Sequence, residues 1–341
     1  VSPRDDVEVR RITITNRGTN VAKLEVTSYF EPVLDKLEAD LAHPAFSKLF
    51  VLTEYVDEGN ILLATRRPRT DKSKKVYLFN TVAVKGRNSG SIEFETDRSK
   101  FLGRGNTLKN PHAMQTDLPL SNTSGCVLDP VMSLRVNVTI LPGRSAVITY
   151  INGVAPTREK AIELARQLKK DYAVDDIFKM ALFDSEVEMN YLGLTAKQVN
   201  AIQDLVGSIY YPSRLMRGPA DVIEKNKLGQ PGLWKFGISG DIPIMLLRIS
   251  DESQLTSLRD VVSAYEYMKK NGMKLDFVIL NEEKSDYFQP LQQKISDTIS
   301  NRKIYYPNNT HDGRIYLLKS RQMTEEEINL LLTVSRIVLS D

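Results

Sequence analysis

The sequence has few of the residues from which metal centres and disulfide frameworks are built. Cys126 is the only cysteine, and the three histidines, His43, His112 and His311, lie far apart along the chain. One cysteine excludes an intrachain disulfide and a cysteine-rich zinc site, and no histidine belongs to an H-E-x-x-H motif. A single cysteine is also compatible with a reducing compartment. We therefore expect neither a metal ion nor another cofactor.

A strong charge of either sign and a long apolar run are also absent. Lysine and arginine total 46 against 43 aspartate and glutamate residues, a formal net charge of +3. A chain with so balanced a charge is not expected to have the dense basic surface that nucleic-acid binding requires. No apolar run reaches the roughly 18 residues of a membrane-spanning helix. Because 41% of the residues are hydrophobic, we expect packed cores, no nucleic-acid partner and no direct membrane contact in this segment.

Residues 1–155 show the alternation of apolar and polar residues that is typical of β-strands. The chain opens with VSPRDDVEVRR, without methionine and already strand-like, which favours a fragment of a longer protein. Turn residues separate further runs such as AKLEVTSYF, NILLATRR and KVYLFNTVAV, and LPGR joins MSLRVNVTI to SAVITYING. Many short strands with turns between them predict an antiparallel β-sandwich.

The alternation changes phase inside the first strand. Val7 and Val9 are apolar in one phase, whereas Ile12 and Ile14 are apolar in the other. A slip of one residue moves side chains to the opposite face of a sheet, so the sequence predicts a β-bulge at Arg10–Arg11.

Residues 156–232 are expected to form a helical linker. Thr157 precedes REKAIELARQLKKDY, whose apolar residues recur at helical spacing, and is a candidate N-cap. Thr195 precedes a second such run and has Gln198 three residues later, which is the pattern of a capping box.

Residues 233–341 alternate strands with helices. IPIMLLRIS and LDFVILN are nearly continuous apolar runs, as in strands buried on both faces. Gly272 is expected to end the helix between them, and Thr324 with Glu327 forms a capping box before the last helix. Strand–helix–strand order predicts parallel strands with a right-handed crossover. The expected fold class is therefore α+β and multi-domain: a β-sandwich, a helical linker and a small α/β layer.

The segment FETDRSKFLGRGN, residues 94–106, is the densest group of charges and glycines. Gly103 and Gly105 form only G-x-G, and Pro111 interrupts any helix after them, so a nucleotide-binding loop is not supported. Glu95 and Asp97 are candidates for the two carboxyl groups of a glycosidase, although any strand places alternate residues on one face.

We favour a structural interpretation in which Asp97, Arg98 and Arg104 form a salt-bridged loop. The other glycine-rich stretch, GISGD at 237–241, precedes its strand, whereas a dinucleotide-binding loop follows one, so we expect a tight turn. Trp234 is the only tryptophan. We favour an aromatic anchored in the core over a platform for stacking sugars.

Several blocks of the sequence, taken in order, resemble one family. They are SPRDDVEVRRITITNRG, LTEY, ADLAHPAFSKLFV, LLATRRPR, FETDRSKFLGRGN, GCVLDPVMSLRV and LWKFGISGDIPI, and they run from residue 1 to about 245, with DFVILNEE beyond. The ordered set resembles the large cyclic β-1,2-glucan synthases of bacteria, in the region of glycoside hydrolase family 94 and the cellobiose-phosphorylase relatives.

The resemblance implies a parent enzyme of the bacterial inner membrane, with this segment on its cytoplasmic side. That parent polymerises glucose from UDP-glucose, cyclises the chain and adjusts its length with a phosphorylase-like module. The module combines a β-supersandwich, of the galactose-mutarotase-like and carbohydrate-binding-like type, with an (α/α)₆ barrel carrying a catalytic aspartate. Twelve barrel helices need well over about 200 residues. Only about six helices are expected after residue 155, so we assign no catalytic residue.

The first hypothesis for function is a non-catalytic, sandwich-containing segment of a cyclic β-1,2-glucan synthase. It would scaffold the other domains of the synthase and hold β-1,2-glucan, with Asp97, Arg98, Arg104 and Trp234 as the candidate sugar-binding residues. The first alternative is a phosphate-dependent glycoside phosphorylase or hydrolase that acts alone, with Asp97 as acid and the two arginines binding phosphate. The second alternative is a structural spacer without a ligand.

Overall fold

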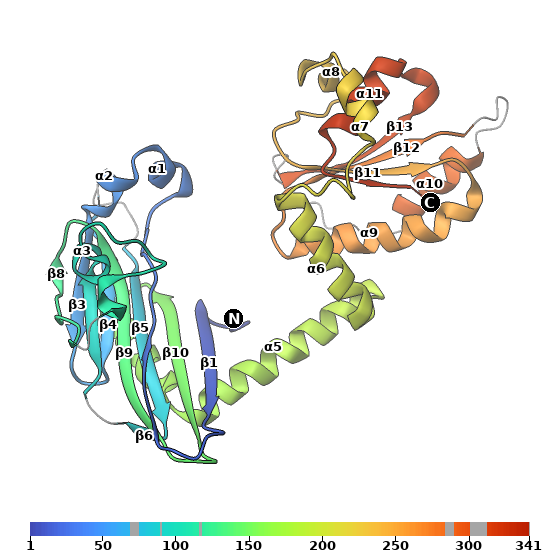
Figure 1. Cartoon of the computed structure of the whole chain (residues 1–341). Coiled ribbons are helices and arrows are strands. Elements are labelled where there is room, and N and C mark those ends of the chain that lie inside the picture. Colours follow the sequence, from blue (N-terminus) through green and yellow to red (C-terminus); the bar gives the residue numbers. More distant parts are fainter. Residues whose placement is uncertain (69–74, 89–90, 116–117, 284–289, 301–311, 341) are drawn as a thin grey trace. The chain divides into compact units, whose positions relative to one another are not determined.

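The computed structural model describes residues 1–68, 75–88, 91–115, 118–283, 290–300 and 312–340 (Figure 1). The chain divides into two compact units, Val1–Asp184 and Ser185–Asp341. The first contains antiparallel sheets and the second a separate parallel sheet, so the expected α+β class is confirmed. The helices expected over 156–232 are shared between the two units, and the three-part division of the chain stays a prediction.

Two antiparallel sheets form the predicted sandwich in the first unit. The strands of the larger sheet are, in spatial order, β1 (Val7–Thr15), β10 (Ser145–Ala155), β5 (Tyr77–Lys85), β4 (Ile61–Arg66), β3 (Val51–Val56) and β8 (Gly125–Cys126). Those of the smaller sheet are β2 (Ala22–Thr27), β9 (Pro130–Ile140) and β6 (Arg87–Asn88), and β7 (Glu93–Asp97) also pairs with β9. The core between the sheets holds alternate residues of β9, such as Met132 and Leu134, against Ile148 of β10.

The β-bulge predicted at Arg10–Arg11 is wrong. β1 pairs with β10 in unbroken register from Val7 opposite Gly153 to Thr15 opposite Ser145. The two phases arise because different layers cover opposite faces of β1 at its two ends. Val7 and Val9 pack under helices on the outer face, whereas Ile14 packs into the core between the sheets.

Helices cover part of the outer face of the larger sheet. They are α4 (Arg158–Leu168) and the first turns of α5 (Asp171–Leu192), whose buried residues include Ala161, Ala165 and Val174. Thr157 accepts a hydrogen bond from the backbone N–H of Lys160 at 3.2 Å, which confirms the predicted N-cap.

The outer face of the smaller sheet is covered by the segment that follows β7. It contains α3 (Arg98–Leu102) and the 3₁₀ helix η1 (His112–Met114), and a small cluster of Phe101, Leu102, Ala113 and Leu120 packs on Val131 of β9. Two short helices, α1 (Leu37–Ala42) and α2 (Pro44–Lys48), precede β3.

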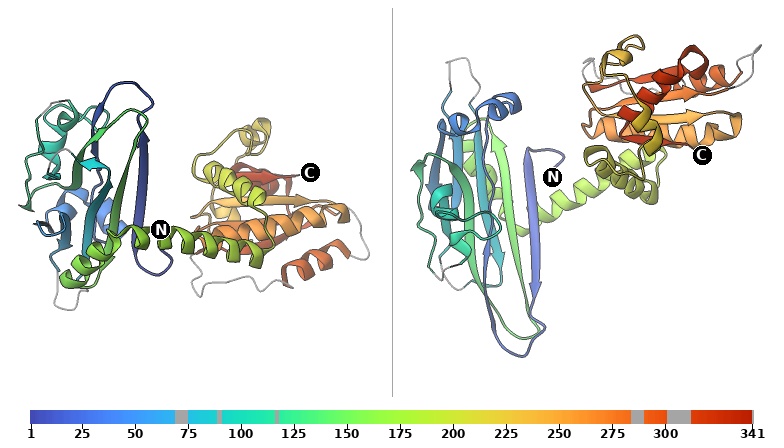
Figure 2. Two further views of the ribbon diagram at one scale, coloured as in Figure 1. Left: turned by 90° about the horizontal axis from the view of Figure 1, so that it is seen from below. Right: turned by 45° about the horizontal axis from the view of Figure 1, so that its top comes forward.

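The second unit is a parallel sheet with helices on both faces (Figure 2). Its strands are, in spatial order, β13 (Ile315–Lys319), β12 (Asp276–Asn281), β11 (Ile244–Ile249) and β14 (Ile337–Leu339), and the parallel strands predicted for this region are confirmed. One face packs against α6 (Ala196–Tyr210), α9 (Leu255–Lys270) and α10 (Pro290–Ser300). The other face packs against α7 (Ala220–Lys225), α8 (Pro231–Trp234) and α11 (Glu325–Val334). The 3₁₀ helices η2 (Glu252–Gln254) and η4 (Ser320–Gln322) follow β11 and β13.

The helix ends of the second unit follow the sequence signals. Both predicted capping boxes, at Thr195 and at Thr324, are present. Gly272 follows the C-cap of α9 with φ of +83°, a conformation that glycine adopts without a Cβ clash. The sequence also predicts a helix over DYFQPLQQKISDTIS; α10 begins at Pro290, and the residues before it lie outside the described part of the chain.

Candidate functional site

The segment 94–106 ends a strand and turns back through one short helix. Gly103 caps the C-terminus of α3 with φ of +77°, and a Cβ there would lie 2.6 Å from Cβ of His112. Gly103 therefore ends a helix, whereas the glycines of a phosphate-binding loop precede one. Gly103 is needed at this position so that the chain can cross over His112.

The two carboxylates of this segment serve the backbone around them. Glu95 is 1% exposed, and its Oε1 accepts hydrogen bonds from the backbone N–H groups of Thr96 at 3.0 Å and Asp97 at 2.9 Å. Its other oxygen accepts from the hydroxyl of Ser121. Asp97 caps α3, accepting from the backbone N–H of Ser99 at 2.8 Å. Because Glu95 is buried and fully bonded, the arrangement does not resemble a pair of catalytic carboxyl groups.

Arg98 is ion-paired with carboxylates from distant parts of the sequence. Its Nε lies 2.8 Å from Oε1 of Glu31, and its Nη1 lies 3.4 Å from Oδ2 of Asp129. Lys48 joins the same two acids, at 2.7 Å from Glu31 and 2.9 Å from Asp129. Two cations and two anions form a closed cluster, which we call the Arg98 cluster.

The Arg98 cluster keeps the carboxylate of Glu31 ionised. Burial raises the pKa of Glu31, but hydrogen bonds donated by Lys48, Tyr29 and Arg98 outweigh it and lower that pKa to about 2. Burial lowers the pKa of Lys48, yet its bonds to Glu31 and Asp129 raise it above the usual value. A carboxylate with so low a pKa is a poor general acid at neutral pH. The cluster is suited to holding α2 and α3 in place.

Arg104 and Trp234 differ from the other two candidates because their side chains face solvent. Arg104 is exposed between Gly103 and Gly105. Trp234 is 61% exposed, so its interpretation as a core aromatic is wrong, and its indole N–H donates to the carbonyl of Ser239 at 3.3 Å. Three of the four candidates lie on one segment of the first unit, and Trp234 belongs to the second unit.

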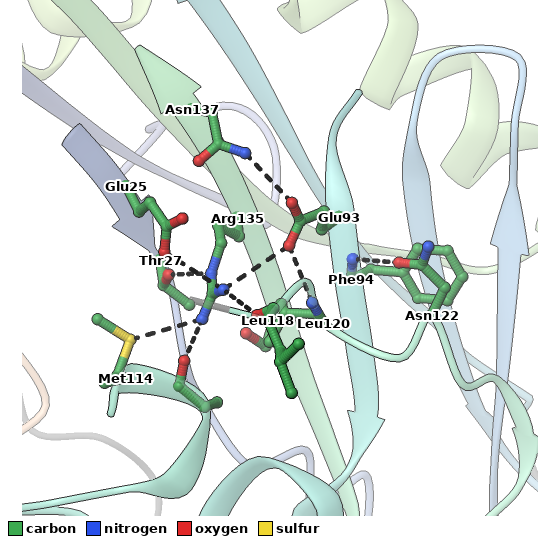
Figure 3. A network of polar contacts seen from close by, with 12 residues as sticks. Glu25, Thr27, Glu93, Phe94, Met114, Leu118, Leu120, Asn122, Arg135 and Asn137 are labelled. Carbon is green, nitrogen blue, oxygen red and sulfur yellow. Dashed lines mark hydrogen bonds and ion pairs between the residues drawn. The ribbon is translucent and has the colours of Figure 1, made fainter. Parts of the chain in front are cut away.

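A buried arginine that the sequence analysis did not single out holds the segment after β7 on the smaller sheet (Figure 3). The side chain of Arg135 on β9 is 1% exposed. Its Nε donates to the hydroxyl of Thr27 at 3.1 Å, and its Nη1 donates to the carbonyl of Leu118 at 3.2 Å. Its Nη2 donates to the carbonyl of Ala113. The sequence signal that could have identified Arg135 is its position inside the apolar run VMSLRV.

Two carboxylates balance the charge of Arg135. Its Nη1 lies 3.3 Å from Oε2 of Glu25 and 3.7 Å from Oε2 of Glu93. Glu93 in turn accepts from the backbone N–H of Leu120 at 2.9 Å and from the amide of Asn137 at 3.2 Å. These contacts, with those of Arg135, form a network that fixes the covering segment from η1 to Leu120 on the sheet.

Metal and membrane sites receive no support from the described residues. Within those ranges, no three histidine, cysteine, aspartate or glutamate side chains gather as ligands of a metal ion. His43 joins α1 to α2 and His112 begins η1, whereas His311 lies outside the described residues. No described helix is long and apolar enough to cross a membrane.

Comparisons with known proteins match the two halves of the chain differently. Residues 1–171 match the glycosyl hydrolase 94 supersandwich domain. The cyclic β-(1,2)-glucan synthase NdvB of Rhizobium meliloti (strain 1021) is 32% identical over 338 residues, which cover 99% of this chain and 12% of that protein. The solabiose phosphorylase of Paenibacillus borealis is 24% identical over 182 residues, which cover 53% of this chain and 22% of that protein. The chain thus spans a small part of either relative.

Proposed function

Because the chain belongs to the glycosyl hydrolase 94 supersandwich family, we propose that it is a non-catalytic segment of a cyclic β-1,2-glucan synthase that scaffolds the catalytic modules. The family match confirms the resemblance seen in the sequence blocks. The similarity to a glucan synthase over almost the whole chain supports this parent in preference to a phosphorylase. In the proposed parent, the segment lies on the cytoplasmic side of the bacterial inner membrane.

The observation that carries the scaffold proposal is a group of large apolar residues left exposed on α1, α2 and the residue after them. They are Leu37, Leu41, Phe46 and Leu49, which are 66%, 71%, 54% and 49% exposed. Soluble monomers rarely leave clusters of large apolar side chains in water unless the surface contacts a partner. A spacer without partners would have no use for this surface, which we call the α1–α2 surface.

Ion pairs and hydrogen bonds hold α1 and α2 on the sandwich. Arg66 of β4 lies 2.8 Å from Oδ2 of Asp35 just before α1, and it donates to the carbonyl of Ser47 in α2 at 2.6 Å. Lys48 of α2 belongs to the Arg98 cluster. Ion pairs therefore anchor the short helices to the sandwich, and an anchored surface loses less entropy when a partner docks.

Separate expression tests the scaffold proposal directly. The 341-residue chain and the remaining parts of a cyclic β-1,2-glucan synthase are produced as separate polypeptides, and the complex is isolated through a tag on the chain. We expect stoichiometric co-purification that Leu41→Gln with Phe46→Gln weakens at least tenfold. Leu141→Gln, a change of an exposed leucine in the β9–β10 turn, is the control. Absence of any complex with the unmodified chain would reject the scaffold.

Catalysis by the isolated chain is tested separately. With β-linked glucose disaccharides and inorganic phosphate, we expect no glucose 1-phosphate, because Asp97 caps α3 and Arg98 is ion-paired. Product that appears with the unmodified chain and disappears with Asp97→Asn would favour the phosphorylase alternative instead.

Glucan binding at the candidate residues is the finer part of the proposal. Arg104 and Trp234 have exposed side chains that a sugar can reach. Titration of linear and cyclic β-1,2-glucans, followed through Trp234 fluorescence and calorimetric heat, tests it. A fluorescence change that Arg104→Ala leaves intact would place any bound sugar near Trp234 in the second unit.

A further inference from the structure

The helices on the outer face of the larger sheet stop short of one end of three strands. On this face of β1, Val7 and Val9 are buried under α4 and α5, and Arg11 and Thr13 are exposed. Arg11 lies opposite Thr149 of β10, which lies opposite Ala83 of β5. The next row contains Thr13, Val147 and Lys85. Two rows of side chains across β1, β10 and β5 thus continue this face beyond Val7 and Val9.

These rows form the floor of a groove, and the junction of α4 and α5 forms its wall. The cavity has a volume of about 350 Å³, within the range of small-ligand sites. Its polar lining includes Arg11, Thr13, Lys85, Thr149, Asp171 and Asp175. All of these residues belong to the first unit. None of them is a candidate that the sequence identified, and we call this cavity the β1–α5 groove.

The charges that line the groove are paired across it. Arg11 Nη2 lies 2.7 Å from Oδ1 of Asp175, and Lys85 Nζ lies 3.4 Å from Oδ2 of Asp171. Lys169 is the fifth charged residue, and its ammonium donates to the carbonyl of Gly59 at 2.8 Å while burial lowers its pKa. A lining of paired charges favours a neutral polar ligand over a phosphate or another ion, because no strong net charge remains to balance one.

Thr149 is the most enclosed threonine in the groove, and the described residues supply no partner for its hydroxyl. Thr149 is 6% exposed and lines the cavity, yet its side chain makes no hydrogen bond to the described residues. Because this hydroxyl lines the cavity and makes no hydrogen bond to the described residues, it can donate to and accept from a ligand or water there. Val147 and Val174 add apolar surface beside it. The guanidinium of Arg11 also lies over the ring of Phe178 at 5.1 Å.

We propose that the β1–α5 groove is a binding site for a neutral oligosaccharide, with Thr149, Lys85 and Asp171 contacting the sugar hydroxyls. Hydroxyls both donate and accept, so they can bond a threonine, an ammonium and a carboxylate together. The valine side chains face the C–H surface of a sugar ring. The choice of β-1,2-linked glucose rests on the proposed function, whereas the site itself rests on the groove.

Calorimetric titration of the 341-residue chain with linear β-1,2-glucan oligosaccharides tests the site, with cello-oligosaccharides as the linkage control. We expect saturable binding to the unmodified chain. Thr149→Val keeps the shape of the side chain and removes the hydroxyl, so the dissociation constant should rise about fivefold, the equivalent of one net hydrogen bond. Asp171→Asn should raise it by a similar factor.

A matched control separates the groove from general surface effects. Glu54→Gln is the same kind of change as Asp171→Asn, in an exposed ion pair with Arg158 outside the groove. It should leave the dissociation constant unchanged. Asp171 and Glu54 are both substantially exposed, so neither change should prevent folding even if Thr149→Val did.

Two results would overturn the site. One is the absence of binding at millimolar sugar. The other is binding that Thr149→Val and Asp171→Asn leave intact but that Arg104→Ala or Trp234→Ala removes. In both cases the co-purification experiment judges the scaffold function separately, so a failure of the groove and a failure of the proposed function are distinguishable.

Discussion

The first unit has two charged regions, the segment over the smaller sheet and the groove on the larger sheet. They use the same residue types in opposite ways. Over the smaller sheet, Arg135 and Arg98 are bonded on several sides by carboxylates, hydroxyls and carbonyls. In the groove, the ion pairs are exposed and the hydroxyl of Thr149 has no protein partner among the described residues. Saturated polar groups stabilise the fold, whereas unsaturated ones at a cavity are available to a ligand.

The largest expected effect is on Arg135. Arg135→Met should lower the free energy of unfolding of the first unit by about 3 kcal/mol, because it leaves the buried carbonyl of Ala113 without its donor and removes the ion pair with Glu93. Urea unfolding followed by circular dichroism measures this change. Tryptophan fluorescence is unsuitable, because Trp234 is the only tryptophan and belongs to the second unit. Arg104→Met, at an exposed position in the same segment, should change the free energy by less than about 0.5 kcal/mol. Equal effects of the two changes would contradict the structural role of Arg135.

A glycine pair in the same segment provides the second comparison. Gly103 and Gly105 have φ of +77° and +78°, but only Gly103 would place a Cβ against another residue. Gly105→Ala should cost about 1 kcal/mol from backbone strain alone. Gly103→Ala should cost about 1–2 kcal/mol more, because His112 would have to move. Thermal unfolding of the two variants measures the difference, and identical midpoints would show that the contact with His112 is not tight.

Acid should weaken the Arg98 cluster in a defined pH range. The pKa of Glu31 is lowered from 4.5 to about 2, so its stabilising contribution is fully present well above 4.5 and is lost as the pH falls towards 2. The difference in unfolding free energy between the unmodified chain and Glu31→Gln should therefore shrink over this range. Glu58→Gln, which changes a largely exposed carboxylate, is the control and should have little effect at any pH. A difference for Glu31→Gln that does not vary with pH would show that Glu31 is not held as a carboxylate.

The smallest effect is expected in the groove. Asp175→Asn removes the exposed ion pair with Arg11 and should change the free energy of unfolding by at most about 0.5 kcal/mol. The same measurement by circular dichroism applies. A loss of several kcal/mol would place the groove among the stabilising regions and remove the contrast with the segment over the smaller sheet.

Much of the fold was predictable because its signals are local. The caps at Thr157, Thr195 and Thr324 join atoms three residues apart, and such contacts are visible in a short stretch of sequence. The alternation along β9 and the apolar runs of β11 and β12 likewise indicate which residues are buried. The family resemblance adds the parent enzyme, which no local pattern contains.

The failed predictions concern which layer covers which face. The phase change in β1 suggested a bulge, but the strand is regular and two different layers cover its opposite faces. Trp234 looked like a core residue by type and proved exposed. An apolar or aromatic residue carries no information about the element that packs against it, so both errors have the same origin.

Sequence patterns alone place many of the strands, several helix ends and the turn at Gly272, since each depends on residues within a few positions of one another. Only the tertiary structure decides the partners of the charged groups. Arg98 meets Glu31 from 67 positions away, and Arg135 meets Thr27 from 108 positions away. A charge can pair with any opposite charge that the fold brings near. Whether the charged groups form a saturated network or line an open groove is therefore decided only when the fold brings distant strands side by side.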